Sequence, residues 1–83
     1  MSIRDELHRF LLDDLGARHD LTSLKPDQDL IRAGVIDSLG IQELIAFLES
    51  RFGISVADRD LVPANFQTPS RIEAFIEEKT NAA

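Results

Sequence analysis

With 83 residues, of which 43% are hydrophobic, the chain can bury one small core but not two. It has no cysteine, which excludes a disulfide scaffold, a thiolate metal site and a cysteine nucleophile. Its formal net charge of −6 disfavours binding to DNA or RNA and predicts partners with basic surfaces. We therefore expect residues 1–83 to form a single, monomeric domain.

The sequence shows no targeting or membrane segment. Met1 is followed by charged, amphipathic sequence rather than by the apolar stretch of a secretory signal. The apolar runs are a few residues long, whereas a helix needs about 20 to cross a bilayer. Together with the absence of cysteine, these features predict a cytoplasmic protein without a membrane span. Met1, and a tail expected to fray from Thr80 to Ala83, favour a free-standing protein.

Helical spacing of apolar residues predicts a first helix from Ser2 to about Leu15. The apolar positions are Ile3, Leu7, Phe10, Leu11 and Leu15. Ser2 is suited to cap the start of this helix, and Gly16 to stop it. Asp5 and Glu6 suit its first turn because they complement the helix dipole.

A long connection from Ala17 to Asp37 follows and contains Pro26 and Gly34. A loop of this length needs anchors in a small domain, so we expect its lone apolar side chains to pin it across the helices. These side chains are Leu21, Leu24, Leu30, Ile31, Val35 and Ile36. A short turn of helix is expected around Asp29–Ala33.

The second helix is predicted from Ser38 to Phe52, with Gly53 as its C-terminal stop. Its apolar stripe consists of Leu39, Leu44, Ile45, Leu48 and Phe52. After it, Ile54–Val56 alternates like a strand but is too short to be one.

The rest of the chain predicts a short third helix from Asp58 to about Leu61, limited by Pro63, and a longer last helix. Thr68 is the expected N-cap of the last helix, and Pro69 its first residue. Its inward-facing residues are Ile72, Phe75 and Ile76, and Lys79 suits its last turn. Three main helices and one short helix predict an all-α fold, a small four-helix bundle.

Ser38 stands at the mouth of the second helix, between Asp37 and Leu39. A helix start exposes unpaired N–H groups and a partial positive charge, which suit a phosphate. A serine in this place is most often only an N-cap. By itself, Ser38 therefore leaves a structural and a chemical interpretation open.

A hydrolase is the weakest interpretation, because a serine nucleophile needs a base and an oxyanion hole. The two histidines, His8 on the first helix and His19 in the polar loop, are both expected at the surface. The pattern G-x-S-x-G requires glycine at position 36, where the chain has Ile36. We therefore predict no catalytic residue and no enzyme activity.

Three acids of the long loop, Asp27, Asp29 and Asp37, invite comparison with a calcium-binding EF-hand. An EF-hand loop requires glycine at its sixth position and an acid at its twelfth. Counted from Asp27, these positions hold Arg32 and Ser38. No metal site is predicted.

Residues 34–49, GVIDSLGIQELIAFLE, resemble the prosthetic-group segment of acyl carrier proteins, in which an Asp-Ser-Leu motif opens the second helix. Residues 50–56, SRFGISV, are similar to the end of that helix and the next loop. Residues 58–79, DRDLVPANFQTPSRIEAFIEEK, are similar to the family's short third helix and its fourth helix. The resemblance covers nearly the whole chain and implies a single carrier domain with the acyl-carrier type of bundle.

The resemblance also implies a role for each matching residue. Ser38 carries 4′-phosphopantetheine through a phosphodiester, and the thiol of that arm holds an acyl or aminoacyl group as a thioester. Asp37 helps the modifying transferase and its metal to engage the site, and Leu39 gives partners an apolar contact. The acids expected to meet basic patches on partner enzymes are Glu43, Glu49, Asp58 and Asp60. The implied partners are a phosphopantetheinyl transferase, a loading ligase and downstream synthases or transferases.

Two departures from the fatty-acid carriers weaken a housekeeping role in fatty-acid biosynthesis. Gly40 stands where those carriers often have an acid, and Arg51 interrupts an acidic run. Residues 65–72, NFQTPSRI, are similar to aminoacyl-type carriers, including D-alanyl carrier proteins. The sequence therefore does not distinguish a fatty acyl, a polyketide and an aminoacyl cargo. It also leaves open whether the protein serves fatty-acid or secondary-metabolite biosynthesis.

The competing interpretation is an acidic helical adaptor that binds a basic protein and carries no prosthetic group. An adaptor explains the charge and the fold equally well. It does not explain why Asp37, Ser38 and Leu39 stand before the helix in this register.

Overall fold

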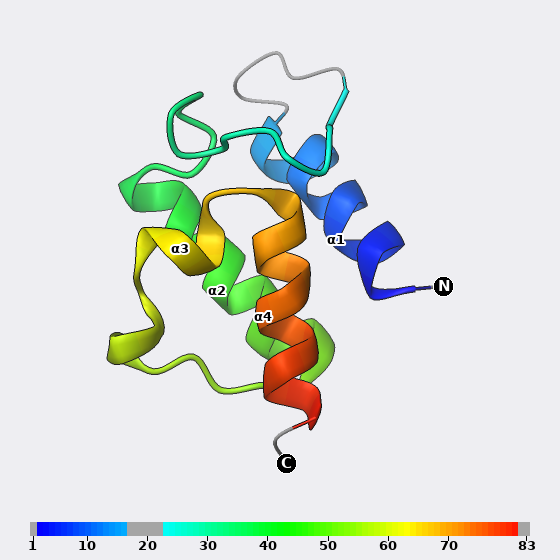
Figure 1. Cartoon of the computed structure of the whole chain (residues 1–83), viewed down its shortest axis with the longest axis vertical. Helices are drawn as coiled ribbons and strands as arrows, with labels where there is room; N and C mark the ends of the chain where they lie inside the picture. Colours follow the sequence, from blue (N-terminus) through cyan, green and yellow to red (C-terminus); the bar gives the residue numbers. More distant parts are fainter. Residues whose placement is uncertain (1, 17–22, 82–83) are drawn as a thin grey trace.

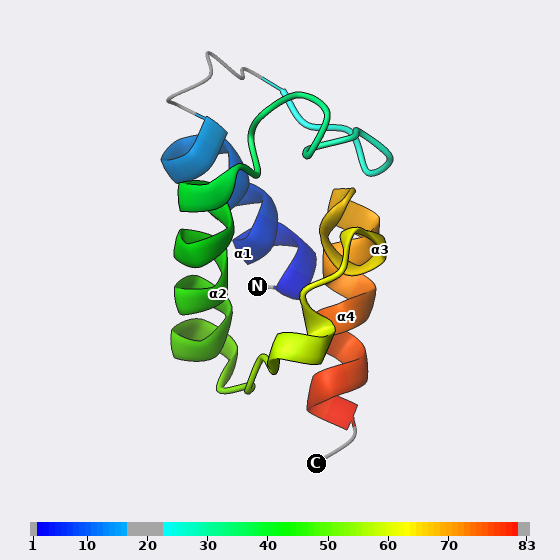
Figure 2. The ribbon, with the colours of Figure 1, turned by 90° about the vertical axis from the view of Figure 1, so that its left-hand side faces the viewer.

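The computed structural model describes residues 2–16 and 23–81, and these form helices and connecting turns without a strand. The elements are α1 (Ile3–Phe10), the π-helix η1 (Leu11–Leu15), α2 (Ser38–Phe52), the 3₁₀ helix η3 (Asp58–Asp60), α3 (Pro63–Phe66) and α4 (Pro69–Asn81). Helix α4 packs against α1, α2 and α3 (Figure 1). In Figure 2 the long helices α2 and α4 stand on opposite sides, with α1 between them and α3 on the side of α4. The all-α four-helix fold expected from the sequence is confirmed.

The starts of α1 and α4 and the end of α2 lie where the sequence predicts them. At the start of α1, Ser2 Oγ accepts a hydrogen bond from the Asp5 N–H (3.1 Å), and at the start of α4, Thr68 Oγ1 accepts one from the Arg71 N–H (3.1 Å). Gly53 ends α2 with a φ of 68°, in the left-handed region that glycine adopts without steric cost. These signals act over three or four residues, which is why the sequence predicts them.

One hydrophobic core joins the helices and the long loop. Its buried side chains are Leu7, Leu11, Leu15, Leu30, Val35, Ile36, Leu44, Leu48, Ile54, Phe66, Ile72, Phe75 and Ile76. The three inward-facing residues predicted for α4 are among them. Because helices this short are marginal in isolation, burial of this apolar surface supplies most of their stability.

The part of the long loop within residues 23–37 is pinned to the helices, as expected. Leu30, Val35 and Ile36 are 0%, 1% and 7% exposed, and Leu24 packs against the core. Ile31 differs from the expectation, because its side chain is 38% exposed. Leu21 lies outside the described residues.

Backbone hydrogen bonds hold this loop in one conformation. The N–H groups of Val35 and Ile36 both donate to the Leu30 carbonyl (3.0 and 3.1 Å), and the Leu30 N–H donates to the Gln67 carbonyl (2.7 Å). The turn expected around Asp29–Ala33 is present. In it, the Ala33 N–H donates a hydrogen bond to the Asp29 carbonyl (3.1 Å). The loop is thus fastened both to itself and to the segment between α3 and α4.

Pro63 starts a helix that the sequence analysis did not expect. Pro63 was predicted to limit a helix from Asp58 to Leu61, but η3 ends at Asp60 and Pro63 opens the one-turn helix α3. Proline suits the first helical position because an N–H there would have no intrahelical acceptor. Phe66, at the end of this turn, is 2% exposed, so tertiary burial supports α3.

Two helix ends differ from the predictions. Gly16 caps the end of the first helical segment as expected, but Leu11–Leu15 form the π-helix η1 instead of an α-helix. The predicted fraying at Thr80 is wrong, because α4 continues to Asn81 and Thr80 Oγ1 donates a hydrogen bond to the Glu77 carbonyl (3.0 Å). Residues 82–83 lie outside the described part of the chain.

Candidate functional site

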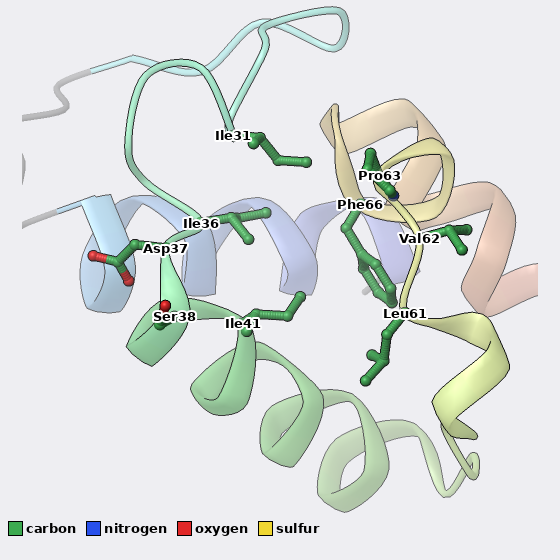
Figure 3. A pocket seen from close by; sticks show the side chains of 9 residues that line it. All are labelled: Ile31, Ile36, Asp37, Ser38, Ile41, Leu61, Val62, Pro63 and Phe66. Atoms are coloured by element: carbon green, nitrogen blue, oxygen red, sulfur yellow. The ribbon is translucent and has the colours of Figure 1, made fainter.

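Ser38 is the first residue of α2 and is exposed to solvent (Figure 3). The N-cap is not Ser38 but Asp37, whose Oδ1 accepts a hydrogen bond from the Gly40 N–H (2.7 Å). The purely structural interpretation of Ser38 as a cap is therefore wrong. Among the described residues, no hydrogen bond engages Ser38 Oγ, so this hydroxyl is presented at the positive end of a 15-residue helix.

An apolar cavity of about 400 Å³ opens beside Ser38. Its lining residues are Ile31, Ile36, Asp37, Ser38, Ile41, Leu61, Val62, Pro63 and Phe66. Figure 3 shows the loop and α2 forming one wall and the segment from Leu61 to Phe66 forming the other. Asp37 is the one titratable residue among the described residues of this lining, so they offer mainly an apolar surface next to the hydroxyl.

Four large apolar side chains are exposed in the described part of the chain, and we call them the apolar rim. They are Ile31 (38% exposed), Leu39 (56%), Leu61 (44%) and Val62 (44%). Three of them line the cavity, and the fourth, Leu39, directly follows Ser38. Exposed apolar patches are typical of surfaces that bind a ligand or another protein.

The exposure of Leu39 corrects its predicted place in the apolar stripe of α2. Leu44 and Leu48 are fully buried, Phe52 packs against the core and Ile45 is half-buried. Leu39 lies five residues before Leu44, about 140° further around the helix, and so points away from the core. The same geometry makes it available to a partner, as the resemblance implies.

Three of the four acids predicted to meet partners, Glu43, Glu49 and Asp60, have interaction partners within the molecule. Glu49 Oε2 accepts a hydrogen bond from the Val56 N–H (3.0 Å), and Asp60 Oδ2 lies 2.8 Å from Lys79 Nζ. Glu43 is half-buried on α2, and Asp58 is exposed on η3. Sequence reasoning missed the first two contacts because each joins residues that are distant along the chain or in an irregular segment.

Asp60 fastens the segment that leads into the far wall of the cavity. Besides Lys79, its Oδ2 accepts the Ala57 N–H (2.9 Å), and its carbonyl accepts Asn65 Nδ2 (2.8 Å). The hydrogen bond from Lys79, followed by that from the Ala57 N–H, holds the pKa of Asp60 below its ordinary value. Leu61 and Val62 follow directly, so this carboxylate secures one side of the cavity to α4.

Asp29 plays the corresponding part on the loop. Its Oδ1 accepts the Arg32 N–H (2.9 Å), and its Oδ2 accepts Gln67 Nε2 (2.9 Å). The Arg32 N–H, and then the Gln67 side chain, lower the pKa of Asp29. The loop that carries Ile31 is thereby tied to the end of α3.

The described residues of this site include neither a metal-binding cluster nor a histidine. His8 is half-buried on α1 and does not line the cavity, while His19 lies outside the described residues. Across residues 2–16 and 23–81, no group of three His, Cys, Asp or Glu side chains could hold a metal ion. No helix in those ranges is long and apolar enough to span a membrane.

Comparison with known proteins identifies the family. The profile of the family described as "Phosphopantetheine attachment site" matches residues 5–76. The chain belongs to this family of phosphopantetheine-binding carrier proteins. It is 41% identical over 56 residues to the D-alanyl carrier protein of Streptococcus suis and 43% identical over 56 residues to that of Streptococcus thermophilus; each match covers 68% of this chain and 71% of the relative.

Membership in this family identifies the prosthetic group as 4′-phosphopantetheine, which is bound covalently. The chain is a carrier protein with such an arm. The site fits this group, because it combines an exposed hydroxyl at a helix N-terminus with an adjoining apolar cavity. Nothing in the comparisons supports an adaptor without a prosthetic group. Carrier proteins typically catalyse no reaction themselves and work with ligases and transferases.

We expect Asp60 to make stability dependent on acidic pH. The pKa of Asp60 is lowered in the folded state. The carboxylate therefore stabilises the fold at pH values above its ordinary pKa of 3.8, and this stabilisation is lost as the pH falls from that value through the folded-state pKa. The free energy of unfolding of Asp60→Asn should lie below that of the wild type near neutral pH, and the gap should narrow on acidification. Urea denaturation followed by circular dichroism at a series of pH values measures the difference in the free energy of unfolding.

Asp58→Asn, on the same 3₁₀ helix, controls for the loss of a carboxylate. A difference between Asp60→Asn and the wild type that does not depend on pH would contradict the prediction.

Proposed function

We propose that Ser38 is the residue that carries the phosphopantetheine arm and that the arm holds an aminoacyl group, with D-alanine as the first candidate. The observation that carries the attachment is the exposed Ser38 hydroxyl on the first turn of α2, with Asp37 serving as the cap. A phosphodiester on Ser38 faces the N–H groups at the helix start, where a negative charge is favoured by about 0.3–1 kcal/mol.

Attachment at Ser38 is a phosphoryl transfer from coenzyme A. The Ser38 oxygen forms a bond to the phosphorus that bears pantetheine, the pyrophosphate bond of coenzyme A breaks, and adenosine bisphosphate leaves. The proton of the hydroxyl passes to a base of the transferase, since the described cavity lining offers no base besides Asp37. In this proposal Asp37 helps the transferase and its metal to engage the site.

The arm then supplies what this chain lacks. The chain has no cysteine, and the thiol at the end of the arm provides the sulfur on which a thioester forms. The bonds to the cargo are made and broken by partner enzymes, so we propose that the chain itself is not an enzyme. A thiol must stay reduced to be loaded, which supports the proposed cytoplasmic location.

The aminoacyl cargo is supported by the names of the relatives and by two features of the chain. The relatives are named D-alanyl carrier proteins. Gly40 departs from the fatty-acid carriers, and the segment 65–72 resembles aminoacyl-type carriers. We propose loading by an ATP-dependent ligase and delivery to a downstream transferase rather than a place in fatty-acid synthesis.

Partner enzymes are proposed to dock on the apolar rim, with acids around it for steering. Leu39, Leu61 and Val62 supply apolar contact next to the attachment point. The proposed steering acids are Glu43, Glu49, Asp58 and Asp60, of which Glu49 also binds the Val56 N–H and Asp60 also pairs with Lys79. Charge then affects mainly the encounter, and apolar contact the bound state.

Modification should occur at Ser38 and at no other residue. Incubation with coenzyme A, Mg²⁺ and a broad-specificity transferase is expected to raise the intact mass by one phosphopantetheine group, and Ser38→Ala should remain unmodified. Ser50→Ala, which removes another exposed hydroxyl of α2, is the matched control and should be modified like the wild type. An unmodified wild type, or an adduct that survives Ser38→Ala, would refute the assignment.

Loading should favour an amino acid over a fatty acid. The phosphopantetheine-bearing protein is incubated with ATP, an aminoacyl-activating ligase or a fatty-acyl ligase, and D-alanine, L-alanine or octanoate. We expect a D-alanyl adduct, detected by intact mass and released by hydroxylamine, which cleaves thioesters. Preferential loading of octanoate would contradict the aminoacyl assignment while leaving the attachment at Ser38 intact.

The two contributions to docking should respond differently to salt. Leu39→Ala and Leu61→Ala are expected to lower kcat/KM for modification about tenfold at low and high salt, as loss of a central apolar contact does. Glu43→Lys and Asp58→Lys should lower kcat/KM mainly at low salt, because screening weakens charge effects as salt rises. Circular dichroism confirms that each variant is folded, and unchanged kinetics for all four would place the docking surface elsewhere.

A further inference from the structure

Gly40, the third residue of α2, has no room for a side chain. It is buried, and a Cβ atom at this position would lie 2.7 Å from the Val35 carbonyl oxygen and 3.1 Å from Asp37 Oδ1. Real Cβ atoms essentially never come within 3.0 Å of a heavy atom outside their own and the adjoining residues. The obstacle is a backbone oxygen, which cannot rotate away as the tip of a flexible side chain can.

The Val35 carbonyl is held in place by the loop around it. The N–H groups of Val35 and Ile36 both donate to the Leu30 carbonyl, and the side chains of all three residues are buried. Leu30 is further tied to Gln67 by a backbone hydrogen bond of 2.7 Å. A side chain at position 40 would therefore push the start of α2 away from a fixed loop.

The direction of that push concerns Ser38. In an α-helix the bond from Cα to Cβ tilts toward the N-terminus, which at Gly40 means toward Val35 and Asp37. Ser38 lies in the chain between the loop and Gly40, so a shift of the first turn moves its hydroxyl. The shift also strains the cap, in which the Gly40 N–H donates to Asp37 Oδ1 at 2.7 Å.

We infer that Gly40 is a positioning residue for the modification of Ser38: the absence of a side chain lets α2 begin directly against the Val35 carbonyl, and this contact sets where the Ser38 hydroxyl stands. The inference rests on the proposed attachment at Ser38. It gives a physical reason for glycine at a position where helix propensity alone favours almost any other residue.

Helix propensity and the close contact predict opposite results for Gly40→Ala. Alanine is normally more stable than glycine within a helix, so propensity predicts a higher denaturation midpoint. The contact with Val35 predicts a lower midpoint and slower modification. A displacement of about 1 Å at a reacting group can cost about a hundredfold in rate.

The test measures kcat and KM for phosphopantetheine transfer from coenzyme A to Gly40→Ala. For Gly40→Ala we expect kcat to fall by about tenfold to a hundredfold and KM to change by less than about threefold, because the apolar rim remains available for docking. Circular dichroism establishes that each variant is folded under the assay conditions.

Two matched variants separate positioning from general stability. Ile76→Val weakens the core in α4, away from the loop, and should keep the wild-type kcat. Gln42→Ala changes an exposed residue of α2 and should also leave kcat unchanged. If Gly40→Ala is partly unfolded, the kinetics are measured with trimethylamine N-oxide added to restore the folded state.

Each outcome decides the inference. The inference is overturned if folded Gly40→Ala keeps the wild-type kcat, or if Ile76→Val loses as much kcat as Gly40→Ala. It is also overturned if Gly40→Ala stays unfolded in the presence of the osmolyte. A wild type that is not modified, or a Ser38→Ala variant that is, refutes the attachment at Ser38 instead. Failure of the inference and failure of the proposed function are therefore distinguishable.

Discussion

The contact between the loop and the first turn of α2 determines where the Ser38 hydroxyl lies. The Leu30 carbonyl accepts two N–H groups of the loop, which turns the chain so that the Val35 carbonyl meets α2 at Gly40. Asp37 then caps the helix, and Ser38 becomes its first residue with its hydroxyl directed to solvent. Backbone geometry, rather than a network of polar side chains, places this hydroxyl at the positive end of a helix.

The cavity beside Ser38 depends on the same loop and on a second, separately fastened segment. One wall is held through Asp29 and Gln67, and the other through Asp60 and Lys79. Both acids have a lowered pKa because each accepts hydrogen bonds as a carboxylate. The chain thus shapes an apolar surface next to the hydroxyl, and carrier proteins typically leave bond making to partner enzymes.

The net charge of −6 gives an incomplete picture of the surface around Ser38. Ion pairs join Arg4 to Glu73 and Arg51 to Glu6, so part of the acidic excess connects helices across the bundle. Four large apolar side chains, the apolar rim, are exposed around Ser38 and its cavity. An acidic chain with an apolar rim is suited to a partner that is attracted from a distance by charge and held at close range by apolar contact.

The sequence by itself determined the features that act over a few residues. The caps at Ser2 and Thr68, the stop at Gly53 and the Asp-Ser-Leu motif are local, because a helix end is satisfied by side chains three or four positions away. The periodicity of the apolar residues was enough for the all-α fold and for most of the core. The family resemblance followed from the same local order of residues.

Tertiary structure alone decided which side chains around Ser38 are free to meet a partner and which are already engaged. The exposure of Leu39 and Ile31, the helix at Pro63 and the pairing of Asp60 with Lys79 all depend on how the loop and α4 pack. So does the need for glycine at position 40, because the Val35 carbonyl reaches it through the fold of the loop and not through the helix itself. Such contacts join segments whose meeting is set by burial of the shared core, and no pattern within either segment specifies them.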